Sequence, residues 1–454
     1  MHRVTEIARN GDWLSRERVR LIAAAILVAS IAGFLFLVLT AHGINDRQGR
    51  PIGTDFSDVY AAGTYVLDGK ADLPFDLPAQ YAREQAIFGP STPFYSWHYP
   101  PYFLFIAGAL ATMPYAVAFA VWQASTLALY LLTIWAILSA PFLRVREEGL
   151  QPAQNGATAP PTGCQSNKGP ATRSAGRGDY LWLLLALAYP AVLINIGHGQ
   201  NGFLTAALLG GALVLLERRP VVAGVLIGLL VYKPQFGLML PLALIAGGHW
   251  RAFAAAAVTV ALLTLATTMA FGPDVWHAFL LSTKLSRTVV LEDGNTGWQK
   301  IQSLFSWARM WGAPIPLAYA LQGALTLALG AAIVRLWRGG APPALKRASL
   351  CFAAILATPY SLDYDMMVLA PGIAFYAVDG VQRGFRPWEK TALAALWLAP
   401  LVARSVAQVA LIPLGVPAML AVFLLLLWRA GFGRTFWRWP LPLRRVPAQN
   451  VKPG

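Results

Sequence analysis

Apolar residues occur along the chain in runs that are separated by short polar segments. The first run, residues 21–41, contains no charged residue and follows the basic stretch Arg16, Arg18 and Arg20. A helix that spans a bilayer needs about 20 mainly apolar residues, whereas the apolar segment of a cleaved signal peptide has only about 7–15. The pattern therefore predicts a first membrane span that is not cleaved.

Eleven further apolar runs follow, several of them short and bounded by Pro or Gly. Together with the first run they predict an all-α integral membrane protein, a multispanning bundle of about twelve transmembrane helices. These runs are centred near residues 115–140, 180–196, 202–217, 219–232, 235–248, 252–271, 313–336, 348–361, 365–379, 391–410 and 412–429.

The segment 99–113 is also apolar, but it opens with Pro100 and Pro101 and is separated from the next run by Pro114. Its 15 residues are few for a span. Counting it as a crossing would also place the five basic residues of 141–179 on the outer side, against the tendency of basic loops to stay in the cytosol. We therefore expect a half-embedded juxtamembrane helix in the first outer loop.

The distribution of charge gives the expected topology. If the twelve runs cross, 26 of the 36 Lys and Arg residues but only 9 of the 21 Asp and Glu residues fall on the side of both termini. By the positive-inside rule, both termini are then cytosolic. The expected segments are the cytosolic N-terminus 1–20, the first two spans 21–140 with the outer loop 42–114, the cytosolic linker 141–179, ten spans in 180–430 and the basic tail 431–454.

Composition excludes several classes of protein. With 57% hydrophobic and 13% charged residues and a mean hydropathy of +0.52, the chain is not a soluble enzyme. The net charge of +15 is scattered between apolar runs, which argues against nucleic acid as a partner. Cys164 and Cys351 are too far apart in sequence to suggest a disulfide framework or a zinc site. Residues 148–178 are rich in Pro, Gly, Ala, Ser and Thr and predict a flexible linker.

Polar residues collect at the predicted outer ends of the spans. Asp55 and Asp58 lie soon after the first span and share a face if the segment is helical. A carboxylate at a membrane surface can act as a general base towards a hydroxyl. The alternative is a solvated loop carboxylate or a helix N-cap.

The turn 195–202, Asn-Ile-Gly-His-Gly-Gln-Asn-Gly, joins the third and fourth spans. Its amides, Gln200 and Asn201 among them, and the imidazole of His198 suit sugar hydroxyls or phosphate oxygens. The alternative is a turn between helices whose amides cap backbone groups. A metal ligand role for His198 has little support, because no partner lies at ligand spacing.

Two basic residues on the predicted outer side are candidates for phosphate binding. Lys233, followed by Pro234 and Gln235, is the only charge in the apolar stretch 221–246, and charges at membrane depth are usually functional. Its alternative is snorkelling to the interface. Arg287 lies in the outer segment 272–311 among Trp, His and Lys residues, a mixture that is also typical of an aromatic membrane anchor.

The outer junction at 358–365 carries two tyrosines and two carboxylates, of which Tyr360, Asp363 and Asp365 are candidate binding residues. Carboxylates at that depth need a partner, and Lys233 or Arg287 could serve. His98 precedes the half-embedded helix and could contact a substrate or only shape the rim of the cavity.

Four motifs in this order resemble glycosyltransferase family 87, from about residue 50 to residue 370. They are GTDFSDVYAAG, HYPPYFLFIAGALATMPYAVAFAVW, GHGQNGFLTAALLGGALVLLERRP and YKPQFGLMLPLAL. The resemblance implies a GT-C-like fold in a bacterial inner membrane and an active site on the periplasmic or extracellular face. It implies a hexosyltransferase, first of all a mannosyltransferase, whose donor is a polyprenyl-phosphate sugar and whose acceptor is a glycolipid or glycan.

The resemblance also implies roles for individual residues. The family's catalytic acidic residue falls on Asp55, with Asp58 as the alternative. It would act as the general base that deprotonates the acceptor in one inverting displacement. Lys233 would neutralise the departing phosphate, while Gln200 and Asn201 would hold sugar hydroxyls. The chemistry would need neither a cofactor nor a metal. The rival reading is a transporter or lipid flippase, but no inverted repeat is visible and the polar groups collect on one face.

Overall fold

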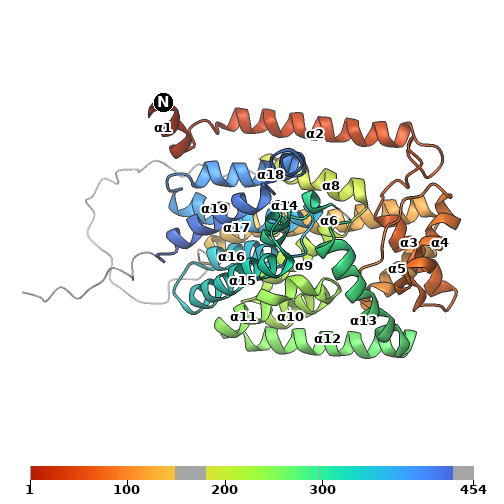
Figure 1. The fold of residues 1–454 in the computed structure, drawn as a ribbon. Coiled ribbons are helices and arrows are strands. Elements are labelled where there is room, and N and C mark those ends of the chain that lie inside the picture. The colour runs from red at the N-terminus through yellow and green to blue at the C-terminus, as the bar shows by residue number, and fades with distance from the viewer. Residues whose placement is uncertain (1, 149–179, 296, 433–454) are drawn as a thin grey trace, which may run out of the picture.

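The computed structural model describes residues 2–148, 180–295 and 297–432. Within these residues the fold is all-helical, with nineteen α-helices, several short 3-10 or π-helical turns and no β-strand (Figure 1). The all-α prediction is therefore confirmed for the part of the chain that the structure describes. Most of the predicted linker 141–179, with Cys164, and nearly all of the tail 431–454 lie outside the described residues.

Five helices are long and apolar enough to cross a membrane. Each has a stretch of 22 to 25 residues that qualifies, which at 1.5 Å per residue exceeds the roughly 30 Å of a bilayer core. The chain is thus a multi-pass membrane protein. These helices are α2 (Arg16–Leu39), α6 (Tyr115–Glu148), α12 (Trp250–Phe271), α15 (Ile315–Arg338) and α18 (Glu389–Ala410).

A sixth candidate span is broken. The helices α7 (Leu181–Leu187) and α8 (Pro190–His198) together pass the same test but meet at an angle of 44°. Pro190 occupies the first turn of α8, where its missing N–H costs no hydrogen bond, and it prevents α7 from continuing.

The remaining predicted runs fold as shorter helices of 8 to 15 residues. Fifteen residues extend about 22 Å, less than a bilayer core, so length and composition support five or six spans and the full number of twelve stays a prediction. The shorter helices are α9 (Gly202–Leu215), α10 (Pro220–Leu229), α11 (Met239–Ala246), α16 (Pro343–Leu356), α17 (Leu369–Arg383) and α19 (Gly415–Arg429).

Short turns carry many of the polar residues that the sequence singled out. The turns η3 (Leu230–Tyr232) and η4 (Pro234–Leu238) flank Lys233, and η7 (Asp363–Val368) precedes α17. After α12, the segment before α15 contains α13 (Asp274–Ser286), the π-helical η5 (Arg287–Glu292), η6 (Trp298–Lys300) and α14 (Leu304–Met310).

The first loop is a compact helical unit at one end of the bundle, which we call the loop end; α1 (His2–Asn10) lies at the opposite end, the α1 end (Figure 1). Gly63 allows close packing between the helices of this unit, because a Cβ there would lie 2.1 Å from the carbonyl oxygen of Ala107. The expected helix 99–113 is a 3-10 turn followed by an eight-residue helix, and its embedding in the membrane stays a prediction. The unit consists of α3 (Phe56–Leu67), η1 (Leu73–Phe75), α4 (Leu77–Phe88), η2 (Pro101–Phe103) and α5 (Leu104–Ala111).

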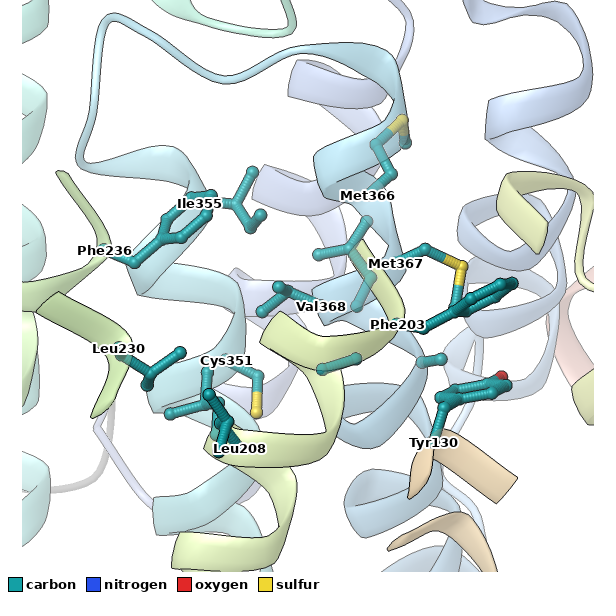
Figure 2. Close-up of a cluster of buried hydrophobic side chains, with 14 of the residues drawn as sticks. Tyr130, Phe203, Leu208, Leu230, Phe236, Cys351, Ile355, Met366, Met367 and Val368 are labelled. Atoms are coloured by element: carbon teal, nitrogen blue, oxygen red, sulfur yellow. The ribbon is translucent and has the colours of Figure 1, made fainter. Parts of the chain in front are cut away.

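The core of the bundle holds η7 in place. Figure 2 shows Met366, Met367 and Val368 in one cluster of buried side chains with residues of α9, α16 and the turns around Lys233, and Met367 lies beside Phe203. These three residues, the second half of η7, are fully buried. Because the second half of η7 is fixed in the core, its first half presents Asp363 and Asp365 at a defined place.

Candidate functional site

Asp55 occupies the N-cap position of α3, but its side chain makes no capping hydrogen bond. The preceding turn is fixed by Gly53, which has a positive φ of 75° and would place a Cβ 2.3 Å from the ring of Phe119. The hydroxyl of Tyr115 donates to the carbonyl of Ile52 at 2.6 Å. The N-cap alternative therefore explains the position of Asp55 in the chain but leaves its carboxylate for other partners.

The turn between α8 and α9 packs directly against this segment. Gly199 ends α8 in the left-handed conformation, and a Cβ there would meet Phe56 at 2.5 Å. The N–H of Asp55 donates to the carbonyl of His198 at 3.0 Å, so the two polar turns are joined through their backbones. The amide of Asn195 accepts from the N–H of Gly202 at 2.7 Å, so this part of the turn does serve as a cap.

Three side chains hold the carboxylate of Asp55. Gln200 Nε2 donates to Oδ2 at 2.8 Å, the Thr54 hydroxyl donates to Oδ1 at 3.2 Å, and His198 Nδ1 lies 3.5 Å from Oδ1. The Tyr99 hydroxyl donates to Gln200 Oε1 at 2.8 Å, so the orientation of the amide is fixed from both sides. The structure thus brings Asp55, His198 and Gln200 together at the loop end.

The same contacts indicate which ring nitrogen of His198 carries a proton. His198 Nδ1 lies 2.8 Å from the Thr54 hydroxyl. Because that hydroxyl gives its only proton to Asp55, it accepts from Nδ1–H. His198 therefore orients Thr54, and Thr54 in turn donates to the carboxylate.

Asp55 stays ionised at neutral pH. Burial raises the pKa of its carboxyl, but the nearby His198 and the hydrogen bonds from Gln200 and Thr54 outweigh that effect and lower the pKa below the ordinary value. The side chain keeps about 24% of its surface exposed. Asp55 is consequently a partly accessible, oriented carboxylate.

Asp58 lies one helical turn further and has the opposite character. Its residue is only 4% exposed, and its Oδ1 has no hydrogen-bond partner. Burial raises the pKa of Asp58 well above the ordinary value, and the nearby Glu84 and Asp55 raise it further. Glu84 is fully buried as well, and burial raises its pKa to about 8. Gln80 links the two, since its Nε2 donates to the Asp58 carbonyl at 3.0 Å and to Glu84 Oε1 at 3.4 Å.

Glu84 predicts a dependence of loop stability on pH. Its pKa is higher in the folded protein than the ordinary value of 4.5, so the folded state binds the proton more tightly and stability falls as pH rises from about 4.5 to about 8. We expect faster proteolysis of residues 56–95 at pH 8.5 than at pH 6, and a Glu84→Gln variant that loses much of this difference. Each tenfold change in proton binding corresponds to about 1.4 kcal/mol. A pH response equal in the variant and the wild type would show that Glu84 is not its source.

Arg404 and Lys300 form a charged cluster with Asp363 near Asp55, and neither cation was among the site residues that the sequence predicted. Arg404 Nη1 lies 3.8 Å from Asp363 Oδ2, and Asp363, Arg404 and Lys300 all interact electrostatically with one another. The pKa of Lys300 is lowered by burial and by the repulsion of Arg404, while Asp55 and Asp363 oppose the shift. A backbone bridge between Ile301 and Leu362 places Lys300 beside η7. A lone arginine inside the predicted span 391–410 was the signal that could have identified Arg404.

Lys233 is paired inside the protein. Its Nζ lies 2.5 Å from Asp365 Oδ1, and both side chains are at most 5% exposed. Asp365 Oδ2 accepts from the N–H of Leu362 at 2.9 Å. Lys233 therefore does not snorkel to the interface. Of the two cations that the sequence suggested as partners for the carboxylates at 358–365, Lys233 pairs with Asp365. As it stands, the ammonium group is not exposed to a ligand.

The other predicted site residues lie at different depths. The ring of His98 lies 6.3 Å from that of Tyr360, and burial lowers the pKa of His98 to about 4. Asn201 is 2% exposed, and neither polar atom of its side chain has a hydrogen-bond partner. Gln235 is half-buried in η4. Arg287 is exposed and pairs with Glu292 at 3.1 Å, so the structure does not bring it to Asp55.

Metal ligands are not grouped at the site. In residues 2–148, 180–295 and 297–432, no three His, Cys, Asp or Glu side chains are arranged to hold a metal ion. The expectation that the reaction needs no metal stays a prediction.

Comparison with known proteins gives one family. The sequence model of glycosyltransferase family 87 matches residues 97–359, more than half of the chain. The matched range contains His198, Gln200 and Lys300, whereas Asp55 precedes it and Arg404 follows it. No curated protein and no solved structure matches the chain.

Proposed function

The chain belongs to glycosyltransferase family 87, and we propose that it transfers a hexosyl unit, first of all a mannosyl unit, from a polyprenyl-phosphate donor to a hydroxyl of a glycolipid or glycan. Membership in the family and the candidate spans establish a membrane glycosyltransferase. The proposal adds the lipid-phosphate donor, the identity of the sugar and a site at the outer face of a bacterial inner membrane. The charge distribution of the loops supports that orientation.

The oriented carboxylate of Asp55 is the observation that carries the proposal. A general base must be ionised, reachable and held in one geometry. Asp55 meets all three conditions, because its pKa is lowered, its side chain is a quarter exposed and three neighbours fix its position. Asp58 is not reachable, because it is buried, and burial raises its pKa well above the ordinary value. We therefore assign the base to Asp55.

The reaction that we propose is a single displacement. Asp55 accepts the proton of the acceptor hydroxyl while the acceptor oxygen forms a bond to the anomeric carbon. The bond from that carbon to the phosphate oxygen breaks on the opposite face, and its electron pair leaves with the polyprenyl phosphate. Attack opposite the leaving group inverts the configuration at the anomeric carbon.

The departing phosphate needs positive charge, and we assign this role to Lys300 and Arg404 rather than to Lys233. Lys300 lies within electrostatic range of Asp55 and Asp363, and Arg404 lies within range of Asp363. Arg404 is 37% exposed, while Lys233 is buried against Asp365. Preorganised cations stabilise charge that develops in the transition state. The site would thus hold a base and a phosphate-binding pair at the loop end.

This assignment predicts that Arg404→Gln and Lys300→Gln each lower kcat/KM for the donor by about 10- to 100-fold, the worth of a charge-assisted hydrogen bond. Arg404→Lys keeps the charge and should recover part of the loss. Arg287→Gln is the matched control, because Arg287 is an exposed arginine paired with Glu292, and should change kcat/KM little. Steady-state kinetics in liposomes measures all four variants. A loss for Arg287→Gln as large as that for Arg404→Gln would contradict the assignment.

Reconstitution tests the function itself. The purified protein in liposomes receives labelled polyprenyl-phosphate hexoses, one sugar at a time, together with a total lipid extract of the source cells; nucleotide-activated hexoses form the parallel arm. We expect transfer from one lipid-linked sugar and none from the nucleotide sugars. Transfer from nucleotide sugars alone would show that the donor class is wrong. Movement of an intact donor across the bilayer without any transfer would instead favour a flippase.

A further inference from the structure

An apolar cavity lies beside the first span. Its volume is about 560 Å³, within the roughly 300–1,000 Å³ of small-molecule sites. Its wall is almost entirely apolar and comes from α2, α6, α7, α17 and α18. Aromatic rings, including Tyr130, Trp182, Tyr189 and Trp397, form much of this wall.

The helix that covers the cavity is loosely attached. Of the residues of α2, Ala23 is buried, and Figure 1 shows this helix running along the outside of the bundle. Ile22 and Val19 of α2 face the cavity. A loosely attached helix can admit a chain from the bilayer between itself and the bundle.

At the α1 end, the cavity is bordered by Trp13, which is hydrogen-bonded to the start of α18. Trp13 lines the cavity, and its Nε1 donates to the Thr391 hydroxyl at 3.0 Å. The Thr391 hydroxyl donates to the carbonyl of Ala8, and the N–H of Trp388 donates to the carbonyl of Arg9 at 2.6 Å. These contacts fasten α1 and Trp13 to the start of α18.

At its other end the cavity is linked to the charged site by a hydrogen bond and by α18. The hydroxyl of Tyr189, which lines the cavity, donates to the carbonyl of Met366, the residue after Asp365. Trp397 of the cavity and Arg404 of the site lie on the same helix, seven residues apart, a distance of about 10 Å along the axis. A phosphate held by Arg404 would therefore have the cavity within reach of a lipid chain attached to it.

We propose that this cavity holds the isoprenoid chain of the donor beyond its first units, so that the fold selects long-chain donors. This inference rests on the proposed function, because it takes the phosphate to lie at Arg404 and Lys300. The continuity of α18 from Arg404 to Trp397 and the apolar aromatic wall support this occupant. The isoprenoid chain would enter the cavity from the bilayer rather than from water. The selectivity for chain length would therefore come from packing and not from the hydrophobic effect.

Two donors of different chain length test the inference. One carries two isoprene units, which place little of the chain in the cavity, and the other carries the long polyprenyl chain of bacterial membranes. Ala377→Trp and Ala394→Trp fill the cavity from half-buried positions on its wall. Ala257→Trp is the matched control, because Ala257 is exposed on α12. The expected result is a loss of about tenfold in kcat/KM for the long donor, since overpacking an occupied space costs at least that much, with the short donor and the control changed less than about twofold.

Each result has a definite meaning. An equal loss for both donors, or no loss for either, would overturn the inference while leaving the proposed function intact. If the wild type transfers from neither donor, the proposed function fails, and binding decides about the cavity separately. For that arm a long-chain polyprenyl phosphate with a photoreactive group at its far end is cross-linked to the protein. Labelling of residues 181–189 and 389–398 that the filling variants reduce supports the inference, whereas equal labelling by a photoreactive phospholipid overturns it.

Discussion

Replacing Asp55 by Asn is expected to lower kcat for sugar transfer about 100-fold or more, the usual contribution of a general base. The variant removes the charge and the proton-accepting capacity but keeps an oxygen that can accept the hydrogen bond from Gln200. Binding of the donor should change little, because the residues assigned to the phosphate are Lys300 and Arg404. The measurement is single-turnover transfer from the labelled donor in liposomes, with donor binding determined separately.

Asp58→Asn is the matched control for this prediction. Asp58 lies one helical turn after Asp55, but it is buried, and burial raises its pKa well above the ordinary value. Asparagine nearly matches the shape of a carboxyl group, and Asp58 is buried, so the rate per folded molecule should fall only a few-fold. A loss in Asp58→Asn that exceeds the loss in Asp55→Asn would move the base to Asp58.

Much of the site at Asp55 can be predicted from the sequence, because its parts lie in glycine-rich turns at the ends of apolar runs. The turns around Gly53 and Gly199 each require glycine, for a positive φ and for close packing. Topology places both turns on the same side of the bundle. What the sequence could not supply is the pairing of Gln200 with Asp55 across 145 residues, which depends on how α3 packs against the end of α8.

For the cations, the sequence indicated an unusual environment but not the residues that they face. Lys233 stood out as a lone charge in an apolar stretch, and that signal was correct about a special environment. It could not separate a ligand-binding cation from a buried partner of Asp365, because the two residues lie 132 positions apart. Arg404 carried the same signal within a predicted span, but its importance depends on Asp363, which the fold brings near. Charge patterns locate such residues; packing decides what they face.

The overall fold was predicted in class more securely than in detail. The predicted apolar runs of 20 or more residues formed the five long helices, since length is the main signal of a span. The shorter runs end at Pro or Gly as predicted, for example at Pro234, whereas Pro190 breaks the predicted span 180–196 from within. The sequence could not show that α2 packs loosely or that a cavity lies beneath it, because both depend on the surfaces of several distant helices.

Removing the ammonium group of Lys233 should destabilise the protein strongly. Lys233→Met leaves the carboxylate of Asp365 buried without its cation, and breaking one side of a buried ion pair costs about 3–5 kcal/mol. The pair is only slightly exposed, at 5% and 1% of the two side chains. Thermal unfolding in detergent, followed by tryptophan fluorescence, should show a large drop in Tm and poor recovery of folded protein.

The double variant Lys233→Met with Asp365→Asn separates a structural role of the pair from phosphate binding. Asparagine at 365 can still accept the hydrogen bond from the N–H of Leu362, and with both charges gone no uncompensated ion remains, so most of the lost Tm should return. Donor affinity is the deciding measurement. If Lys233 acts only through Asp365, the stabilised double variant keeps a KM for the donor close to that of the wild type. A Tm that recovers while the donor KM rises tenfold or more would show that Lys233 leaves Asp365 and reaches the phosphate when the donor binds.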